Sequence, residues 1–174
     1  FFVAFTIVHV YLVFYHDYVD SPAAPLFPFG HGLSYTTFAY GELDVVAAGT
    51  RDPLTVAVSV TNSGAAAGTE VVQLYASDLV ASVARPERLL VGFRRVDLAP
   101  GEEKLVTFTV HPSRLAFYDP SMRFVCEPGE FTFAIGASSA DIRVAHTVRL
   151  SGPVAEFRQR EVVATRATVE PLAG

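Results

Sequence analysis

Apolar and polar residues alternate with a period of two through most of the chain after Thr36. In residues 55–61 the side chains of Val56, Val58 and Val60 fall on one face, and polar residues fall on the other. Because successive side chains of a β-strand point to opposite faces, this pattern predicts a strand with one buried face. The same alternation predicts further strands at residues 106–110, 131–135 and 142–150.

Three more segments complete the predicted strands, at residues 38–46, 69–76 and around 89–93. Both faces of segment 69–76 are partly apolar, which favours a place in the interior of its sheet. Turn sequences such as Asn62-Ser-Gly64 and Pro128-Gly129 separate the strands. No stretch after Thr36 keeps a helical period. About seven short strands separated by turns predict an all-β protein with two antiparallel sheets packed over an apolar core.

A different pattern precedes the first strand, in Pro25-Leu-Phe-Pro-Phe-Gly-His-Gly-Leu-Ser-Tyr35. Prolines fix φ at two positions, and Gly30 and Gly32 allow backbone angles that other residues avoid. The segment is too apolar for a solvated linker, since a flexible tether is rich in glycine and polar residues. We therefore expect a connector that is extended and packed by its apolar side chains onto a neighbouring surface.

The two ends of the chain lack this organisation. Residues 1–16 are apolar but shorter than the roughly 20 residues of a membrane helix, and they lack the basic start and small-residue end of a secretory signal. We expect a strand or the remnant of a preceding domain there, and the initial Phe1 suggests a piece of a longer protein or a processed product. Residues 17–37 form the connector and 38–150 the sandwich. Residues 151–174 are expected to be a tail, with a short added strand or a linker as the alternatives.

Composition narrows the class of protein. The chain has 174 residues, 51% hydrophobic and 18% charged, with a formal net charge of −5. This share of apolar residues favours a globular body over a disordered one. The 13 basic residues are scattered, which argues against nucleic acid as a partner. Cys126 stands alone, so no internal disulfide is possible, and a small buried hydrophobe is the expected role.

Few residues have the spacing that chemistry requires. Asp17 and Asp20 are neighbours in the connector, with no enforced separation of the kind that a catalytic pair of carboxyl groups needs, so ion-pairing or capping is expected. Asp119, before a proline, is expected to cap an Asx turn. Asp78 and Glu87 flank a connection long enough to reach a neighbouring domain, either as a solvated crossover or as a loop that approaches a substrate pocket.

The histidines and aromatic residues point to no ligand. The five histidines have no metal-ligand spacing, and we expect neither a metal nor a cofactor. His146 is expected to be a hydrogen-bonded core residue, and His31, between two glycines, to be structural rather than a sugar or domain contact. The chain has no Trp, and no three tyrosines align on an outward face, so carbohydrate binding is unsupported.

Several segments together resemble glycoside hydrolase family 3, the family of β-glucosidases and β-xylosidases. The resemblance covers roughly residues 17–150 and rests on Tyr18-Val-Asp20, Pro25 to Tyr35, Val60 to Gly64, Gly68 to Tyr75, Arg85-Pro86, Leu90 to Phe93, Leu98 to Glu102, Ala116 to Asp119, Pro128 to Glu130 and Gly136 to Ser139. It implies an immunoglobulin/fibronectin III-like antiparallel β-sandwich, the C-terminal domain of such an enzyme. Residues 1–16 depart from the family, whose members have a more polar loop there.

The resemblance also implies a role. In the family the nucleophilic aspartate and the acid/base residue lie in preceding domains, and neither motif occurs here, so this chain is expected to be non-catalytic and to carry no catalytic residues of its own. Its expected partners are those catalytic domains, and no membrane is expected. The residues expected to pack on those domains are Tyr18, Asp20, Leu26, Phe27, Phe29, His31, Leu33 and Tyr35. The alternative is a carbohydrate-binding or surface-adhesion module. The compartment is open, with an extracellular or periplasmic location slightly favoured.

Overall fold

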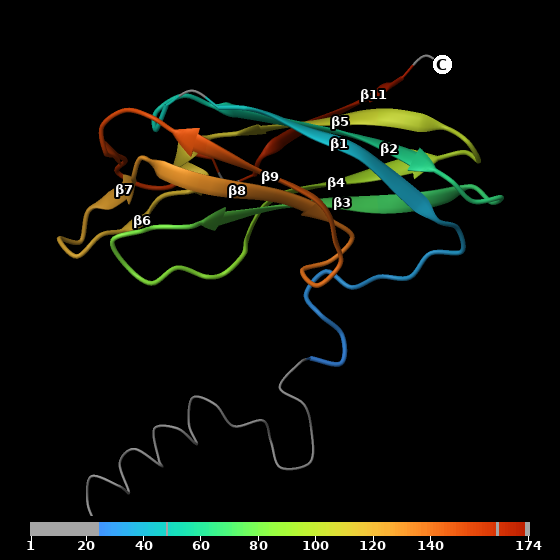
Figure 1. The fold of residues 1–174 in the computed structure, drawn as a ribbon, viewed down its shortest axis with the longest axis horizontal. Helices are drawn as coiled ribbons and strands as arrows, with labels where there is room; N and C mark the ends of the chain where they lie inside the picture. The colour runs from blue at the N-terminus through green and yellow to red at the C-terminus, as the bar shows by residue number, and fades with distance from the viewer. Residues whose placement is uncertain (1–24, 48, 163, 173–174) are drawn as a thin grey trace, which may run out of the picture.

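The computed structural model describes residues 25–47, 49–162 and 164–172, which form a sandwich of two antiparallel sheets (Figure 1). The first sheet has the order β1-β2-β5-β11, and its strands are Phe38–Val46, Leu54–Asn62, Glu103–Val110 and Arg166–Pro171. The second has the order β4-β3-β8-β9, and its strands are Leu89–Leu98, Gly68–Asp78, Gly129–Gly136 and Ile142–Leu150. The predicted sandwich is confirmed, including the interior position of β3.

A small third sheet closes one end of the sandwich. It has the order β10-β7-β6, with strands Ala155–Glu156, Phe124–Cys126 and Phe117–Tyr118. The short 3₁₀ helix η1, at Pro112–Arg114, connects β5 to this sheet. In the part of the chain that the structure describes, no helix has the length and hydropathy of a membrane span.

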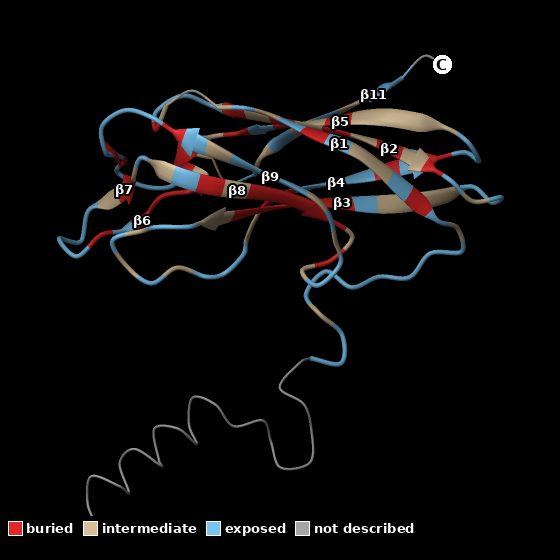
Figure 2. Cartoon of the chain, viewed as in Figure 1, coloured by how far each residue is buried: buried red, intermediate tan, exposed pale blue. Residues whose placement is uncertain are grey.

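The core lies between the inner faces of the two large sheets, where Figure 2 shows the buried residues. The valines of β2 that the alternation placed on one face, Val56, Val58 and Val60, are all buried. They face the buried side chains of Phe131, Phe133 and Ile135 from β8 within one cluster. Burial of these side chains is the main contribution to the stability of the sandwich, since each fully buried one is worth roughly 1.5–3 kcal/mol.

One buried amide joins the turns at the end of β2. Asn62 accepts from the Thr36 hydroxyl at 2.8 Å and from the Gly64 amide at 3.0 Å through its Oδ1. Its Nδ2 donates to the carbonyl oxygens of Ala66 at 2.8 Å and Leu98 at 3.0 Å. With its donors and its acceptor all paired, the amide is stable in an apolar environment. Asn62 ends the strand, as predicted for this turn.

The structure differs from the sequence-based expectations at two places. Residues 151–174 include the added strand that was one of the alternatives, since β11 pairs with β5 from Arg166 opposite Thr109 to Pro171 opposite Lys104. Its alternation is weak because Val169 is its only large apolar residue. The expectation for His146 is wrong: its side chain is exposed. β9 is the edge strand of its sheet, so this position lacks the cover that protects the interior strands.

Candidate docking site on the connector

The described part of the connector, residues 25–37, leads into β1 along the outer side of the second sheet (Figure 1), and its apolar side chains are exposed. Leu26, Phe27 and Phe29 are 87%, 67% and 66% exposed, and Leu33 and Tyr35 are more exposed still. Side chains of this size usually lose contact with water in a folded protein, so their clustering on one exposed segment makes this segment a candidate docking surface.

Three further residues were expected at this site: His31, Tyr18 and Asp20. His31 is exposed, its backbone amide donates to the Pro28 carbonyl at 3.0 Å, and its ring lies 5.3 Å from the Phe27 ring. Tyr18 and Asp20 lie outside the described residues. The predicted site residues that the structure describes therefore all lie within residues 26–35.

The connector backbone is held against the second sheet by Gln73 of β3. Gln73 Nε2 donates to the carbonyl oxygens of Gly30 at 3.0 Å and Ala137 at 2.6 Å. Its Oε1 accepts from the Tyr75 hydroxyl at 2.6 Å. Close by, the Ser139 amide donates to the Phe29 carbonyl at 2.9 Å. The connector is thus tied to both β3 and the β8–β9 loop, which rules out a freely moving tether at this point.

Gly30 is the residue that makes this contact possible. Its φ of +78° lies in the left-handed region, which favours glycine. A Cβ at this position would collide with the Gln73 amide. Gly32, two residues later, has open space around it. Of these two glycines, the backbone therefore requires only Gly30 to lack a side chain.

Sequence reasoning missed Gln73 as a functional residue. It is buried on the outer face of β3, next to the buried Tyr75, whose pKa is raised by burial. The available signal was an amide between Val71 and Tyr75 on a largely apolar strand face. A buried amide requires partners, and those partners lie on segments far from it in the sequence.

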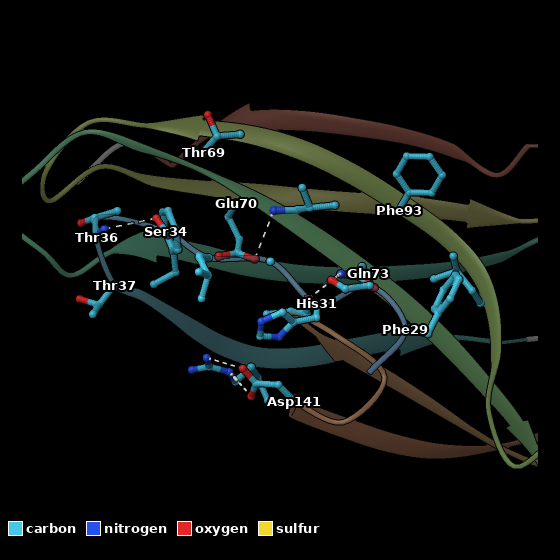
Figure 3. Close-up of a pocket in the computed structure, with 18 residues that line it drawn as sticks. Phe29, His31, Ser34, Thr36, Thr37, Thr69, Glu70, Gln73, Phe93 and Asp141 are labelled. Atoms are coloured by element: carbon cyan, nitrogen blue, oxygen red, sulfur yellow. Dashed lines mark hydrogen bonds and ion pairs between the residues drawn. The ribbon is translucent and has the colours of Figure 1, made fainter. Parts of the chain in front are cut away.

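A pocket of about 530 Å³ lies between the connector and the sheet (Figure 3). Its apolar wall includes Phe29, Leu33 and Phe93, and three charged residues also line it: Glu70, Asp141 and Arg143. Arg143 Nε lies 2.7 Å from Asp141 Oδ1 in an ion pair. Burial raises the pKa of the Glu70 carboxyl, and the hydrogen bonds it accepts and Arg143 partly offset this.

The connection between β3 and β4 forms the wall of a second pocket, of about 740 Å³. Arg85 holds this connection: its Nη2 donates to the Leu115 carbonyl at 2.9 Å, and its guanidinium lies 4.3 Å from the Phe117 ring centroid. Burial raises the pKa of Asp78, which Arg85 partly offsets. That the connection between β3 and β4 approaches a substrate pocket stays a prediction.

Asp119 and Cys126 have the structural roles predicted for them. Asp119 Oδ1 accepts from the amides of Ser121 and Arg123, both at 2.9 Å, which is an Asx-type turn. Arg123 also pairs with Oδ2 at 2.7 Å, and the pKa of Asp119 is lowered by these contacts. Cys126 is buried in β7, and burial raises the pKa of its thiol to about 12. Its thiol is therefore unreactive at neutral pH.

No catalytic arrangement emerges from the described residues. They contain no group of three His, Cys, Asp or Glu side chains that would hold a metal ion. Asp17 and Asp20 lie outside the described residues, so their expected capping or ion-pairing stays a prediction. What the structure brings together is instead an apolar connector, the amide that fixes it, and the pocket beneath it.

Comparison with known proteins identifies the domain. The profile of the fibronectin type III-like domain matches residues 70–139. The chain is 45% identical over 152 residues to thermostable beta-glucosidase B of Acetivibrio thermocellus, covering 86% of this chain and 20% of that protein. It is 48% identical over 125 residues to a beta-xylosidase of Formosa agariphila, covering 71% of this chain and 17% of the relative.

A solved structure shows the same relation. The crystal structure of a beta-glucosidase from Listeria innocua in complex with glucose superposes with a TM-score of 0.74 and 35% identity, covering 82% of this chain and 20% of that one. This chain spans about a fifth of the length of the relatives it matches. It carries a fibronectin type III-like domain and is similar to the C-terminal regions of β-glucosidases and β-xylosidases of glycoside hydrolase family 3.

Proposed function

We propose that this chain is a non-catalytic accessory domain that packs on the catalytic domains of a larger glycosidase and stabilises them. The observation that carries the proposal is the connector: its large apolar side chains are exposed while its backbone is fixed by Gln73. A segment that is both rigid and apolar is suited to binding a complementary surface. Ordering the segment beforehand reduces the entropy lost when the surfaces meet.

The size of the apolar surface makes the packing energetically reasonable. Full burial of a large apolar side chain contributes roughly 1.5–3 kcal/mol, and the most exposed of those on the connector are Leu33 and Tyr35. Burial of only part of these side chains would yield several kcal/mol. This is comparable to the free energy of unfolding of a typical domain, so docking would measurably stabilise both partners.

The parent activity under this proposal is hydrolysis of O-glycosyl bonds, supplied by the other domains. Such hydrolysis requires two carboxyl groups on either side of the scissile bond. Among the described acidic residues, Asp119 accepts hydrogen bonds within its turn and Asp141 pairs with Arg143. The choice of sugar would then belong to the larger enzyme.

A chimera tests the proposal. Residues 25–172 of this chain replace the matching part of the Acetivibrio thermocellus enzyme, and the chimera is compared with the same enzyme truncated before that part. We expect a higher melting temperature and a higher specific activity for the chimera. Equal values for the chimera and the truncated enzyme would reject an accessory, stabilising role.

A pair of variants locates the contact. Leu33→Ser in the chimera is expected to remove much of the gain, because a side chain buried at the contact becomes polar. Met122→Ser is the matched control, since Met122 is 75% exposed in a turn that follows β6 at the other end of the sandwich. Equal loss from both variants would argue against packing through the connector.

A further inference from the structure

The outer face of the second sheet is divided into two unlike halves. Near the connector it presents Val71 and Phe93, which are 42% and 64% exposed. At the other end, Thr132 and Thr147 share a hydrogen bond at 2.8 Å, and Ala145 is their neighbour in β9. The exposed large apolar side chains that the strands of this sheet carry, Val71 and Phe93, therefore lie on the half beside the connector.

Phe93 stands next to the point at which the connector is fastened. In the pairing of β3 with β4 it lies opposite Gln73, the residue that binds the Gly30 carbonyl. Phe93, Val71, Phe29 and Leu33 line the same pocket of about 530 Å³. Apolar side chains from the connector, β3 and β4 therefore line one pocket, where Figure 3 labels Phe29 and Phe93.

Several polar groups of the pocket are paired with partners within the chain. Both amide hydrogens of Gln73 are used, and Arg143 is paired with Asp141. Glu70 accepts from its neighbouring Val71 amide at 3.2 Å, in a half-buried place beside Tyr40. An apolar side chain can fill the pocket without displacing these pairs.

We propose that the pocket between the connector and β3–β4 receives a large apolar side chain from the preceding domain of the same larger protein, with Phe93 and Val71 as part of the docking face. This rests on the proposed function, because it names what that docking face contains. The occupant follows from continuity: the connector is one wall of the pocket and leads directly to the residues before Pro25. A covalently attached partner also has a high effective concentration at this place.

The geometry suits an anchor residue at an interface. Binding energy concentrates in central pockets filled by aromatic or aliphatic side chains, with surrounding residues excluding water. Here the lining also includes the charged pair Asp141 and Arg143, together with Glu70. A partner surface with a Leu, Met or Phe protruding from an apolar patch matches this arrangement.

Phe93→Ser is the variant that tests the inference, measured in two settings. In the isolated 174-residue chain we expect the melting temperature to stay within about 1 °C of the wild type, because changes at an exposed side chain have small effects on stability. In the chimera, the transition that contains this domain is expected to fall by roughly 2–4 °C. Phe93→Leu is expected to keep most of the chimera's stability, and Met122→Ser serves as the control in both settings.

The outcomes separate this inference from the proposed function. A chimera no more stable than the truncated enzyme rejects the proposed function itself. A stabilised chimera in which Phe93→Ser behaves like Met122→Ser rejects only the pocket contact. A loss of equal size in the isolated chain and the chimera would make Phe93 a folding residue and overturn the inference. Dimerisation of the isolated chain that Phe93→Ser abolishes, seen by sedimentation, would assign the pocket to a second copy instead.

Discussion

The core of the sandwich and its connector contain the same kinds of side chain with opposite fates. Phe133 on β8 is fully buried, whereas Phe29 on the connector is 66% exposed. The alternation around Phe133 lets the opposite sheet cover one face of the strand. The connector has no such cover among the described residues, although Gln73 and Ser139 hold its backbone in place. Burial within the chain therefore explains the core, and burial against a partner is what we propose for the connector.

Removal of these two phenylalanines should give the largest contrast. In the isolated chain, Phe133→Ala is expected to lower the free energy of unfolding by roughly 3–5 kcal/mol, because it removes apolar contacts and leaves a cavity. Phe29→Ala should change it by less than about 0.5 kcal/mol, as exposed positions usually do. Urea unfolding followed by fluorescence measures both. Similar losses of unfolding free energy for the two variants would contradict the claim that Phe133 is buried within the chain and Phe29 is not.

Gly30→Ala tests how firmly the connector is held. We expect a loss of roughly 1–3 kcal/mol in unfolding free energy, since the residue must keep a positive φ and its new methyl group would displace the Gln73 amide. Gly32→Ala is the matched control, because nothing lies near that position. If the two alanine variants were equally stable, the backbone of the connector would not be fixed in the way described.

A smaller effect is expected from Asp119, whose turn lies outside both regions. Its folded pKa is lowered from the ordinary 3.8, chiefly by hydrogen bonds from the backbone and by Arg123. The ionised form therefore stabilises the fold above the unfolded pKa, and this contribution is lost as the pH falls through the folded value. Asp119→Asn should be less stable than the wild type at pH 7, with the difference shrinking below about pH 3.8. A pH-independent difference would show that the charge is not the cause.

The smallest effect is expected for retention on polysaccharide. Exposed aromatic residues such as Tyr35 and Tyr118 lie on separate segments, the connector and β6. The sequence pattern aligns no three tyrosines on one outward face on which sugar rings could stack. The isolated chain should pellet with insoluble glucan or xylan no more than serum albumin does. Clear retention above that level would favour the alternative, a carbohydrate-binding or adhesion module.

The fold was largely predictable because the information for it is local. Alternation in Val56 to Val60 or Phe131 to Ile135 identifies the strand and its buried face from a few consecutive residues. The Asx turn at Asp119 follows in the same way from neighbouring residues. Where the local signal is weak, prediction was less definite: β11 offers only one large apolar residue, and the strand was one alternative among several.

The candidate site was less predictable because its contacts join distant parts of the chain. The apolar connector could be recognised from its composition, but Gln73 could not, since its partners at Gly30 and Ala137 are 43 and 64 residues away. The exposure of His146 likewise depends on its position at a sheet edge, which alternation does not report. The order of the strands within the sheets determines which distant residues become partners and which strand lies at an edge.

Hydroxyl-radical footprinting of the connector, read out by mass spectrometry, tests the central claim most directly. The labels on Phe27, Phe29, Leu33 and Tyr35 are compared between the isolated 174-residue chain and the chimera, with Phe133 and Ile135 as buried references. We predict strong labelling of the connector in the isolated chain and marked protection in the chimera, while the references stay protected in both. Equal labelling of the connector in the two proteins would contradict packing of this segment on the catalytic domains.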